Sequence, residues 1–531
     1  MLLLKYINSI GTINMSKVKK IVIYIVVIAL LVGCSLGFIL TPQLSELPKN
    51  NVQEIKPFSS SSELGCNYYR IPSMLTTKDG VVISSVDARF GGTKDSPNNI
   101  DTAVCLSNDN GKSWSEPELV LSFEDWVNDS KILKENGKLS TKNSASAIDP
   151  AMLQDEETGR IFMIVDVFPY GTGAANSEKG SGFTEIDSNK YLMLKRDGEK
   201  EYNYYADKSG NIYSRDGNKT DYSLNSKFEL YENGTPLTVN QKKLVYWYNV
   251  PIGFSAKKEV PMNIMYKDSL FHPIQTSYIY LIYSDDNGNT WSDPVNLNAQ
   301  IKSDNDSFMG VCPGTGIQIK NGEYTGRLIF TAYYRDTETA QQRFTTIFSD
   351  DHGNTWNIGK GVSLSEDLDN LSETQLIQFP DGSLQSFSRS TVGNVASSIS
   401  TDGGVTWSEP FTDDELPLSG GAGCQLSVLN YSGKIDGKDA VMLSAPSLDN
   451  RKNGCIYVGL ITEISNSITA YKIDWRYKKE ITDSNTDFGY SCLTQLPDGN
   501  IGILYESSNA PQSVDSVVFD TYTIEELCQN F

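Results

Sequence analysis

The chain has 531 residues, 39% of them hydrophobic and 10% aromatic, which is enough for one large domain with additions. Its formal net charge of −21 at pH 7, with no basic stripe, argues against nucleic-acid binding. Only two histidines occur, and the eight cysteines are scattered without a Cys-x-x-Cys pair. A Ser-His-Asp hydrolase, a histidine-rich metal site and a disulfide-dense scaffold are therefore disfavoured. Nucleotide-binding glycine motifs are also lacking, so we expect no cofactor and no metal.

The N-terminal segment, 1–40, is expected to be a signal or a membrane anchor. Three lysines precede the apolar run Ile21–Leu40, which is the usual order of charge and hydrophobicity in such segments. Within the run, Leu31-Val32-Gly33-Cys34 resembles a bacterial lipoprotein box, in which Cys34 would be lipidated. An uncleaved transmembrane anchor is the alternative, because the run is just long enough to span a bilayer. Both hypotheses place the rest of the chain on the extracellular face of the cell membrane, after a polar linker over 41–57.

Four copies of the motif Ser-x-Asp-x-Gly-x-(Ser/Thr)-Trp, called boxes below, begin at Ser107, Ser284, Ser349 and Ser400. Each box follows a short alternating run that is typical of a half-buried strand: Ile100–Leu106, Tyr278–Tyr283, Arg343–Phe348 and Val395–Ile399. Asp and Gly favour a tight turn, and Trp supplies a large apolar anchor. The boxes are therefore interpreted as hairpin tips pinned to a sheet, and not as catalytic groups.

A second kind of turn alternates with the boxes and ends in Gly80, Gly159, Gly382 or Gly499. Each of these glycines precedes another expected strand: Val81–Arg89, Arg160–Phe168, Ser383–Arg389 and Ile501–Tyr505. Two alternating strand types with few helix signals predict an all-β protein built from propeller blades.

The gap between the first and second boxes is much longer than the later gaps. It contains a polar, Tyr-rich stretch with short strand-like runs, which we interpret as a small β-rich inserted domain over 170–271. The propeller is then expected over 58–169 and 272–531.

The triplet Arg70-Ile71-Pro72 followed by the boxes resembles the bacterial exo-sialidases of glycoside hydrolase family 33. The resemblance covers about 58–531 and implies a six-bladed β-propeller with an inserted domain. It also implies hydrolysis of terminal α-linked sialic acid, so the expected partners are sialylated glycoproteins, glycolipids or oligosaccharides.

The resemblance assigns roles to eight residues. It implies Asp95 as acid/base, Tyr490 as nucleophile, Glu373 as the partner of the tyrosine, Arg70, Arg389 and Arg451 as ligands of the substrate carboxylate, and Arg89 and Asp149 on the O4 side of the sugar. The chemistry agrees with the assignment, because guanidinium groups bind carboxylates bidentately and stay charged. A neutral tyrosine also suits an anionic substrate better than a carboxylate nucleophile would.

Two alternatives stay open. Family members that carry out intramolecular transfer have a bulky Trp over the site, and the corresponding stretch Tyr505–Ser513 has none, which favours ordinary hydrolysis. A non-catalytic, glycan-binding propeller is the other alternative, although such a protein would have no need of Asp95, Tyr490 and Glu373 together.

Overall fold

The computed structural model describes residues 54–529, leaving out 60–63, 67, 91, 124–132, 136–137, 141–142, 242–243, 248–249, 255–257, 337–338, 365–367, 369, 392, 418–422, 466–467 and 509–515. The expected signal or anchor segment, including Cys34, lies outside the described residues. Strands dominate the described part, and the two short helices are α3 (Asn298–Ile301) and α4 (Ile524–Leu527). Neither of them, nor any other described helix, has the length and apolar character needed to cross a membrane.

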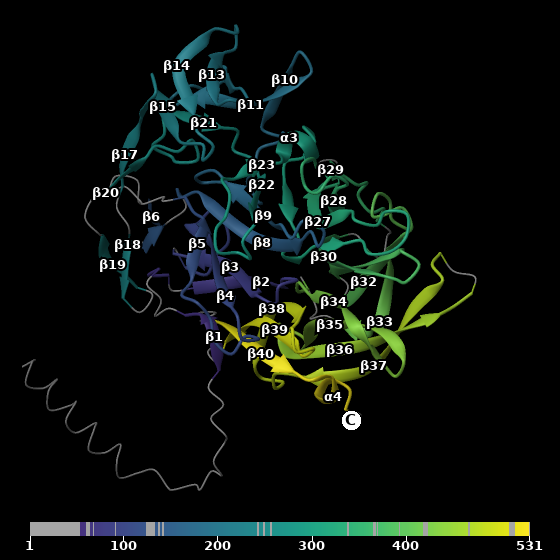
Figure 1. Ribbon diagram of the computed structural model, residues 1–531. Helices are drawn as coiled ribbons and strands as arrows, with labels where there is room; N and C mark the ends of the chain where they lie inside the picture. Colours follow the sequence, from purple (N-terminus) through teal and green to yellow (C-terminus); the bar gives the residue numbers. More distant parts are fainter. Residues whose placement is uncertain are drawn as a thin grey trace, which may run out of the picture. The chain divides into compact units, whose positions relative to one another are not determined.

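Most strands can be grouped into six modules of mainly antiparallel strands (Figure 1). One bridge between the first and second modules, and another between the fifth and sixth, join each of these pairs into a single larger sheet. The first module is β2 (Tyr68–Thr76), β3 (Val82–Arg89), β4 (Ile100–Ser107) and β5 (Glu118–Leu121), and the second is β8 (Ser146–Gln154), β9 (Ile161–Phe168), β22 (Tyr278–Ser284) and β23 (Val295–Asn296). In the third, β24 (Met309–Val311) and β26 (Ile317–Gln318) share the inner edge before β27 (Leu328–Arg335), β28 (Gln342–Ser349) and β29 (Asn357–Ile358), while β25 (Gly314–Thr315) pairs with β8.

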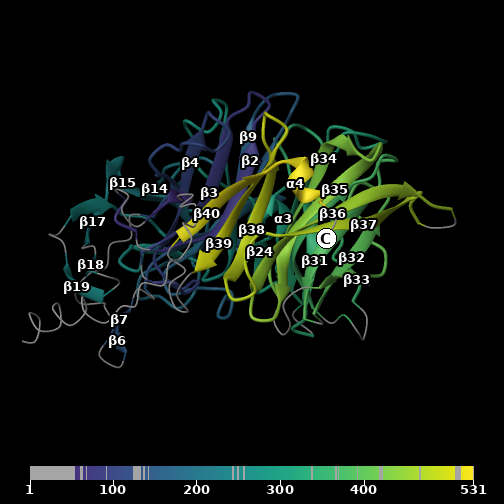
Figure 2. The same ribbon diagram turned by 90° about the horizontal axis from the view of Figure 1, so that it is seen from below.

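The last three modules come from the C-terminal half of the chain and lie side by side in Figure 2. The fourth is β30 (Leu371–Gln378), β31 (Leu384–Ser390), β32 (Asn394–Ser400) and β33 (Phe411–Pro417), and the fifth is β34 (Ser427–Ile435), β35 (Lys438–Leu448), β36 (Lys452–Glu463) and β37 (Tyr471–Glu480). The sixth is β38 (Asp487–Gln495), β39 (Ile501–Ser508), β40 (Ser516–Tyr522) and β1 (Ile55–Phe58).

The linker expected over 41–57 ends earlier than predicted. Residues 55–57 belong to β1, which pairs with β40 through Ile55 opposite Phe519 and Phe58 opposite Val517. Phe58 and Phe519 are both fully buried, so the apolar side chains of this segment draw it into the sheet.

Residues 170–271, expected as an insert, include a separate sheet of short strands. It contains β10 (Phe183–Ile186), β11 (Asn189–Arg196), β12 (Tyr204–Ala206), β13 (Asn211–Ser214), β14 (Lys219–Leu224), β15 (Leu230–Glu232), β16 (Thr235–Pro236) and β21 (Phe271–Pro273). The same stretch contains two further two-stranded sheets: the hairpin of β18 (Leu244–Trp247) with β19 (Val250–Phe254), and the pair β17 (Thr238–Gln241) with β20 (Lys258–Pro261), which flanks that hairpin in the sequence. Another hairpin, β6 (Leu133–Glu135) with β7 (Lys138–Ser140), lies earlier in the chain, between β5 and β8. That the stretch 170–271 is an independent domain stays a prediction.

The boxes are hairpin tips, as predicted, and they also join neighbouring modules. In the third box the Ser349 hydroxyl accepts from the Gly353 backbone N–H at 2.9 Å, and the residue between Asp and Gly, His352, has φ 58°. The Trp356 ring packs at 5.8 Å against Phe162 of the preceding module. A Cβ on Gly353 would lie 2.2 Å from the Phe162 ring, so this close approach requires glycine.

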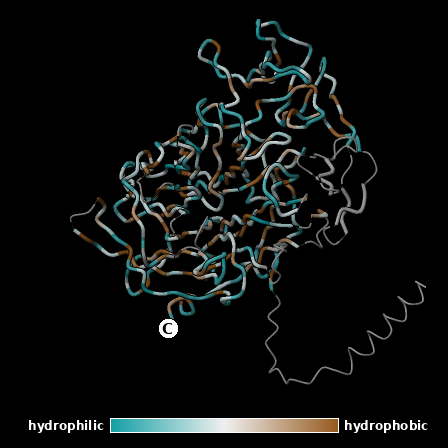
Figure 3. The backbone as a smooth tube through the Cα atoms, turned by 180° about the vertical axis from the view of Figure 1, so that it is seen from behind, coloured by the Kyte–Doolittle hydropathy of each residue, from teal (hydrophilic) through white to brown (hydrophobic). Residues whose placement is uncertain are grey.

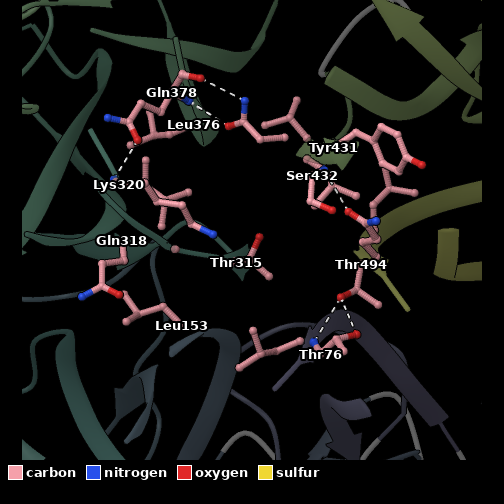
Figure 4. Close-up of a pocket in the computed structure, with 18 of the residues that line it drawn as sticks. Thr76, Leu153, Thr315, Gln318, Lys320, Leu376, Gln378, Tyr431, Ser432 and Thr494 are labelled. Carbon is pink, nitrogen blue, oxygen red and sulfur yellow. Dashed lines mark hydrogen bonds between the residues drawn. The ribbon is translucent and has the colours of Figure 1, made fainter. Parts of the chain in front are cut away.

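A second set of contacts links the ends of the inner strands. In each contact a backbone N–H of one module donates to a side-chain oxygen of a neighbouring module. The pairs are Lys78–Gln154, Glu156–Gln318, Lys320–Gln378, Gln378–Asn430, Ser432–Gln495 and Thr76–Thr494, at 2.8–3.1 Å. They surround a cavity of about 660 Å³, which Figure 4 shows with several of these side chains. The links follow the order of the modules and connect the first module with the sixth.

The apolar core lies between the modules. Clusters of buried side chains join neighbouring sheets, for example Ile279 of β22 with Phe330 of β27, and Val395 of β32 with Leu443 of β35. Figure 3 shows hydrophobic and hydrophilic residues interspersed along the described backbone.

Candidate active site

Four inner strands, β2, β8, β30 and β38, each break register near their start. The breaks fall at Arg70–Ser73, Ile148–Ala151, Leu371–Thr374 and Phe488–Ser491. One expected site residue lies at each break: Arg70, Asp149, Glu373 and Tyr490. Because a bulge turns a side chain away from the regular alternation, these irregularities affect the direction of the expected site residues near the start of their inner strands.

Tyr490 and Glu373 form the centre of the group. The buried Tyr490 hydroxyl donates to Glu373 Oε1, while Arg389 Nη1 donates to Glu373 Oε2 at 2.7 Å and to the Tyr490 oxygen at 3.0 Å. Burial, and then the Glu373 charge, raise the pKa of Tyr490 well above its usual range, although Arg389 and Arg451 act in the opposite direction. The hydroxyl is therefore neutral at ordinary pH and already has an acceptor for its proton.

The other two expected carboxylate ligands, Arg70 and Arg451, lie over the same ring. Their guanidinium carbons are 5.7 Å and 5.3 Å from the centroid of Tyr490. Arg451 has φ 57° in the tight turn between β35 and β36, and its Nη2 donates to the Gly423 carbonyl at 3.3 Å. The structure thus brings all three predicted arginines to one place, around one phenol.

Glu506 on β39 belongs to this group, although the sequence analysis did not single it out. Its carboxylate accepts from Arg70 Nε at 3.1 Å and Nη2 at 3.3 Å, and from the Ile71 backbone N–H at 2.9 Å. Ile71 has φ 59° at the bulge of β2, so Glu506 holds both the arginine and the irregular backbone. The one available signal was an acidic residue at the end of an otherwise apolar strand run.

Asp95 lies on the loop between β3 and β4, with 70% of its side chain exposed. Its Oδ1 accepts from Arg89 Nη1 at 2.7 Å and from Arg70 Nη1 at 3.5 Å. Burial acts to raise the pKa of Asp95, but Arg89 and Arg70 outweigh it and lower the pKa below its usual range. Without a bound ligand Asp95 is therefore ionised near neutral pH.

Asp149 is close to two other carboxylates. Its backbone N–H donates to Asp87 Oδ1 at 3.0 Å, and its φ is 64°. Burial, and then the charges of Asp87 and Asp166, raise the pKa of Asp149 well above its usual range. The structure thus connects Asp149 with Arg89 through Asp87, because Asp87 also accepts from Arg89.

Among the described residues, no group of three or more His, Cys, Asp or Glu side chains is arranged to hold a metal ion.

Comparison with known proteins identifies similar chains. A family model described as a BNR repeat-like domain matches residues 230–503, more than half of the chain. The chain is 39% identical over 483 residues to an anhydrosialidase of Macrobdella decora, covering 87% of this chain and 61% of that protein. It is 36% identical over 475 residues to sialidase B of Streptococcus pneumoniae, covering 87% of this chain and 65% of that protein. The chain thus spans just under two thirds of the length of these two relatives.

Solved structures of two intramolecular trans-sialidases also resemble this chain. The intramolecular trans-sialidase of Ruminococcus gnavus, solved with oseltamivir carboxylate, has a TM-score of 0.81 and 38% identity, covering 89% of this chain and 98% of that one. A structure of the leech intramolecular trans-sialidase with 2,7-anhydro-Neu5Ac also has a TM-score of 0.81, with 37% identity, covering 90% of this chain and 71% of that one.

Proposed function

Because the chain belongs to the sialidase family, we propose that it is an exo-α-sialidase that removes terminal α-linked sialic acid from glycoproteins, glycolipids or oligosaccharides. The observation that carries the proposal is the buried Tyr490–Glu373 contact beneath Arg70, Arg389 and Arg451. Three guanidinium groups suit a substrate with a carboxylate on its anomeric carbon. Release of the fluorophore from a fluorogenic sialoside tests the proposal directly, and a folded protein that cleaves no sialoside would contradict it.

The reaction proceeds by two displacements at the anomeric carbon. In the first, Tyr490 Oη bonds to that carbon as Glu373 takes the phenol proton, and the glycosidic oxygen leaves with a proton from Asp95. In the second, Asp95 takes a proton from water, the water oxygen bonds to the anomeric carbon, and Tyr490 leaves and recovers its proton from Glu373. Two inversions give net retention of configuration.

Substrate binding would prepare Asp95 to act as an acid. In the free protein Arg89 and Arg70 lower the pKa of Asp95, which disfavours its protonated form. A substrate carboxylate that pairs with Arg70 adds a negative charge near Asp95 and engages one of its two cationic neighbours. Both effects raise the pKa of Asp95 in the complex, so binding itself favours the proton that the first displacement needs.

Intramolecular transfer, which releases an anhydro-sialic acid, is a second candidate. The names of the Macrobdella decora and Ruminococcus gnavus relatives favour it. The absence of a Trp from Tyr505–Ser513 favours hydrolysis, although residues 509–515 lie outside the described residues. NMR analysis of the product released from a sialyl-lactose distinguishes the two, because hydrolysis gives free sialic acid and transfer gives its 2,7-anhydro form.

The fold that we infer is a closed six-bladed β-propeller in which each module is one blade. The ring of side-chain to backbone links from Thr76 through Gln378 to Thr494 supports closure, since it joins each module to the next and the first to the last. The pairing of β1 with β40 supports it as well.

For the N-terminal segment we propose lipidation at Cys34 and display on the extracellular face of the cell membrane. The lipoprotein-like sequence Leu31-Val32-Gly33-Cys34 supports this proposal. Labelled palmitate should enter the protein in a bacterial host, and Cys34→Ser should abolish the label. A membrane-bound parent without label would favour the uncleaved transmembrane anchor.

A further inference from the structure

A buried carboxylate, Asp87, lies beside the site and has no part in the reaction described above. Its side chain is fully buried on β3. Oδ2 accepts from Arg89 Nη2 at 2.7 Å and Nε at 3.2 Å, and Oδ1 accepts from the Asp149 backbone N–H at 3.0 Å. Asp87 therefore contacts both residues expected on the O4 side of the sugar.

We propose that Asp87 is a positioning residue for the acid/base group: it fixes the orientation of Arg89, and Arg89 in turn holds Asp95 in place. The inference rests on the sialidase function proposed above and adds to it a residue that does not touch the substrate. The observation that supports the inference is that Arg89 donates from Nε and Nη2 to Asp87 and from Nη1 to Asp95.

One edge of the Arg89 guanidinium group, formed by Nε and Nη2, faces Asp87. Nη1 points to the loop between β3 and β4, where it donates to the Thr93 carbonyl at 2.6 Å and to Asp95 Oδ1 at 2.7 Å. Because the group is planar, fixing the Nε–Nη2 edge fixes the direction of Nη1. Asp87 therefore determines which way Arg89 reaches into the loop.

Asp95 depends on this support because its own loop gives it little. Its side chain is 70% exposed, whereas that of Arg89 is fully buried. Its other charged contact, Arg70 Nη1, is longer at 3.5 Å, and Arg70 is also held by Glu506. Proton transfer to a leaving group needs the acid within hydrogen-bond distance of that oxygen, so an exposed acid on a loop requires a fixed neighbour.

Asp87 also affects the charge that Asp95 experiences. The charged groups facing Asp95 are Arg89 of β3, Arg70 of β2 and Arg451 of the β35–β36 turn. Those facing Asp87 are Arg89 and Arg70, with the carboxylates of Asp149 and Asp166 on β8 and β9. If Asp87 becomes neutral, the positive charge of Arg89 acts on Asp95 without compensation, and the pKa of Asp95 falls further.

The test compares Asp87→Asn with Asp155→Asn on two substrates. Asp155 is a matched control, because it is also a fully buried carboxylate, in the turn between β8 and β9, and accepts from the Glu157 backbone N–H at 3.1 Å and the Thr158 hydroxyl at 2.7 Å without contacting Arg89, Asp95 or Asp149. One substrate is a 4-methylumbelliferyl sialoside, whose leaving group needs little protonation, and the other is a sialyl-lactose, whose leaving group needs an acid.

For Asp87→Asn we expect kcat/KM to fall about tenfold or more further on sialyl-lactose than on the activated sialoside. A positioned acid typically contributes about 10²–10⁴-fold to a rate, and misplacing it should lose part of that contribution. We also expect the alkaline limb of the pH profile of kcat, which reports Asp95 in the complex, to move to lower pH, while Asp155→Asn keeps the substrate ratio and the kcat profile of the parent. Equal losses on both substrates, or a profile like that of the parent, would overturn the inference.

Two further results keep the test conclusive. If Asp87→Asn does not fold, Asp87→Glu keeps the charge but displaces the carboxylate, and it should show the same dependence on the leaving group; equal losses there would count against the inference. A parent protein that cleaves neither sialoside would contradict the proposed function instead.

Discussion

Tyr490 and Glu373 are 117 residues apart in the chain, yet the hydroxyl of Tyr490 donates a hydrogen bond to the carboxylate of Glu373. Each lies at a break in the register of its inner strand, and Arg389 contacts both. In the proposed reaction the buried phenol would be the nucleophile, and the carboxylate that accepts its hydrogen bond would be its base. This pair is the basis of the first prediction.

Tyr490→Phe should fold normally and lose activity by about 10²-fold or more, because it removes one oxygen and the covalent step with it. kcat/KM on a fluorogenic sialoside measures the loss, and thermal unfolding checks the fold. A fluorinated sialic acid should label the parent on the peptide containing Phe488–Leu493 and should not label the variant there. Label on Asp95 or Glu373 would point to a carboxylate nucleophile.

Arg389→Lys should lower kcat/KM strongly although the positive charge is kept. Nη1 of Arg389 makes both contacts, with Glu373 and with Tyr490, and lysine lacks the second guanidinium nitrogen with which the proposed substrate carboxylate would pair. We expect a loss of about 2–4 kcal/mol in transition-state binding. The control is Arg160→Lys, which alters a bidentate pair with Asp285 on the surface, at 2.7 and 2.8 Å, and should leave kcat/KM unchanged. If Arg389→Lys were as active as Arg160→Lys, Arg389 would not be one of the arginines that bind the substrate carboxylate.

Glu506→Gln should weaken substrate binding and lower stability together. The change replaces the buried carboxylate partner of Arg70 with a neutral amide, and loss of one charge of a buried pair costs up to about 3–5 kcal/mol. We expect KM to rise and the free energy of unfolding in urea to fall. Asp520→Asn is a useful comparison, because Asp520 bonds to a neutral Tyr505 in the same module and should raise KM little.

His352→Asn should remove a pH-dependent part of the stability. The His352 ring bonds to Asp155 at 2.9 Å, and this bond raises the pKa of the ring above its usual value. The stabilisation is therefore complete below the unfolded pKa of about 6.5 and disappears as the pH rises through the folded value. Two other boxes have asparagine, Asn110 and Asn287, at the position that corresponds to His352, so asparagine should fit the turn.

The melting temperature at several pH values checks this. The melting temperature of the parent should exceed that of the variant most clearly near about pH 5, and the difference between the two temperatures should shrink toward about pH 8. A difference that does not change with pH would mean that the ring acts through packing alone.

Seven of the eight strands expected next to the boxes and the second turns were predictable to within one residue at each end, because alternation and turn chemistry are local signals. The eighth, Ile501–Tyr505, extends three residues further, to Ser508. The run Ile100–Leu106 became Ile100–Ser107, and Arg343–Phe348 became Gln342–Ser349. The box tryptophans were also predicted as apolar anchors, but the partner of Trp356 was not, since Phe162 belongs to another module. Local patterns specify that a side chain will be buried and not what it will be buried against.

The bulges and Glu506 could not be predicted for the same reason. Ile71 has a positive φ, which a β-branched residue rarely adopts, and nothing near it in the sequence signals this. Its support comes from Glu506, 435 positions away. The resemblance to a family supplied the eight expected site residues, whereas the contacts between them depend on strands that meet only in the folded chain.

The pairing of β1 with β40 has a consequence for protein synthesis. The ribosome makes Ile55–Phe58 before nearly all of the other described residues and makes Ser516–Tyr522 after nearly all of them, so the sixth module cannot be completed until translation is almost finished. Until then, β1 has no partner strand and presents unpaired edges, which are targets for chaperones and for aggregation. A premature stop codon shortly before residue 516 would spare every proposed catalytic residue and still leave β1 without its partner strand.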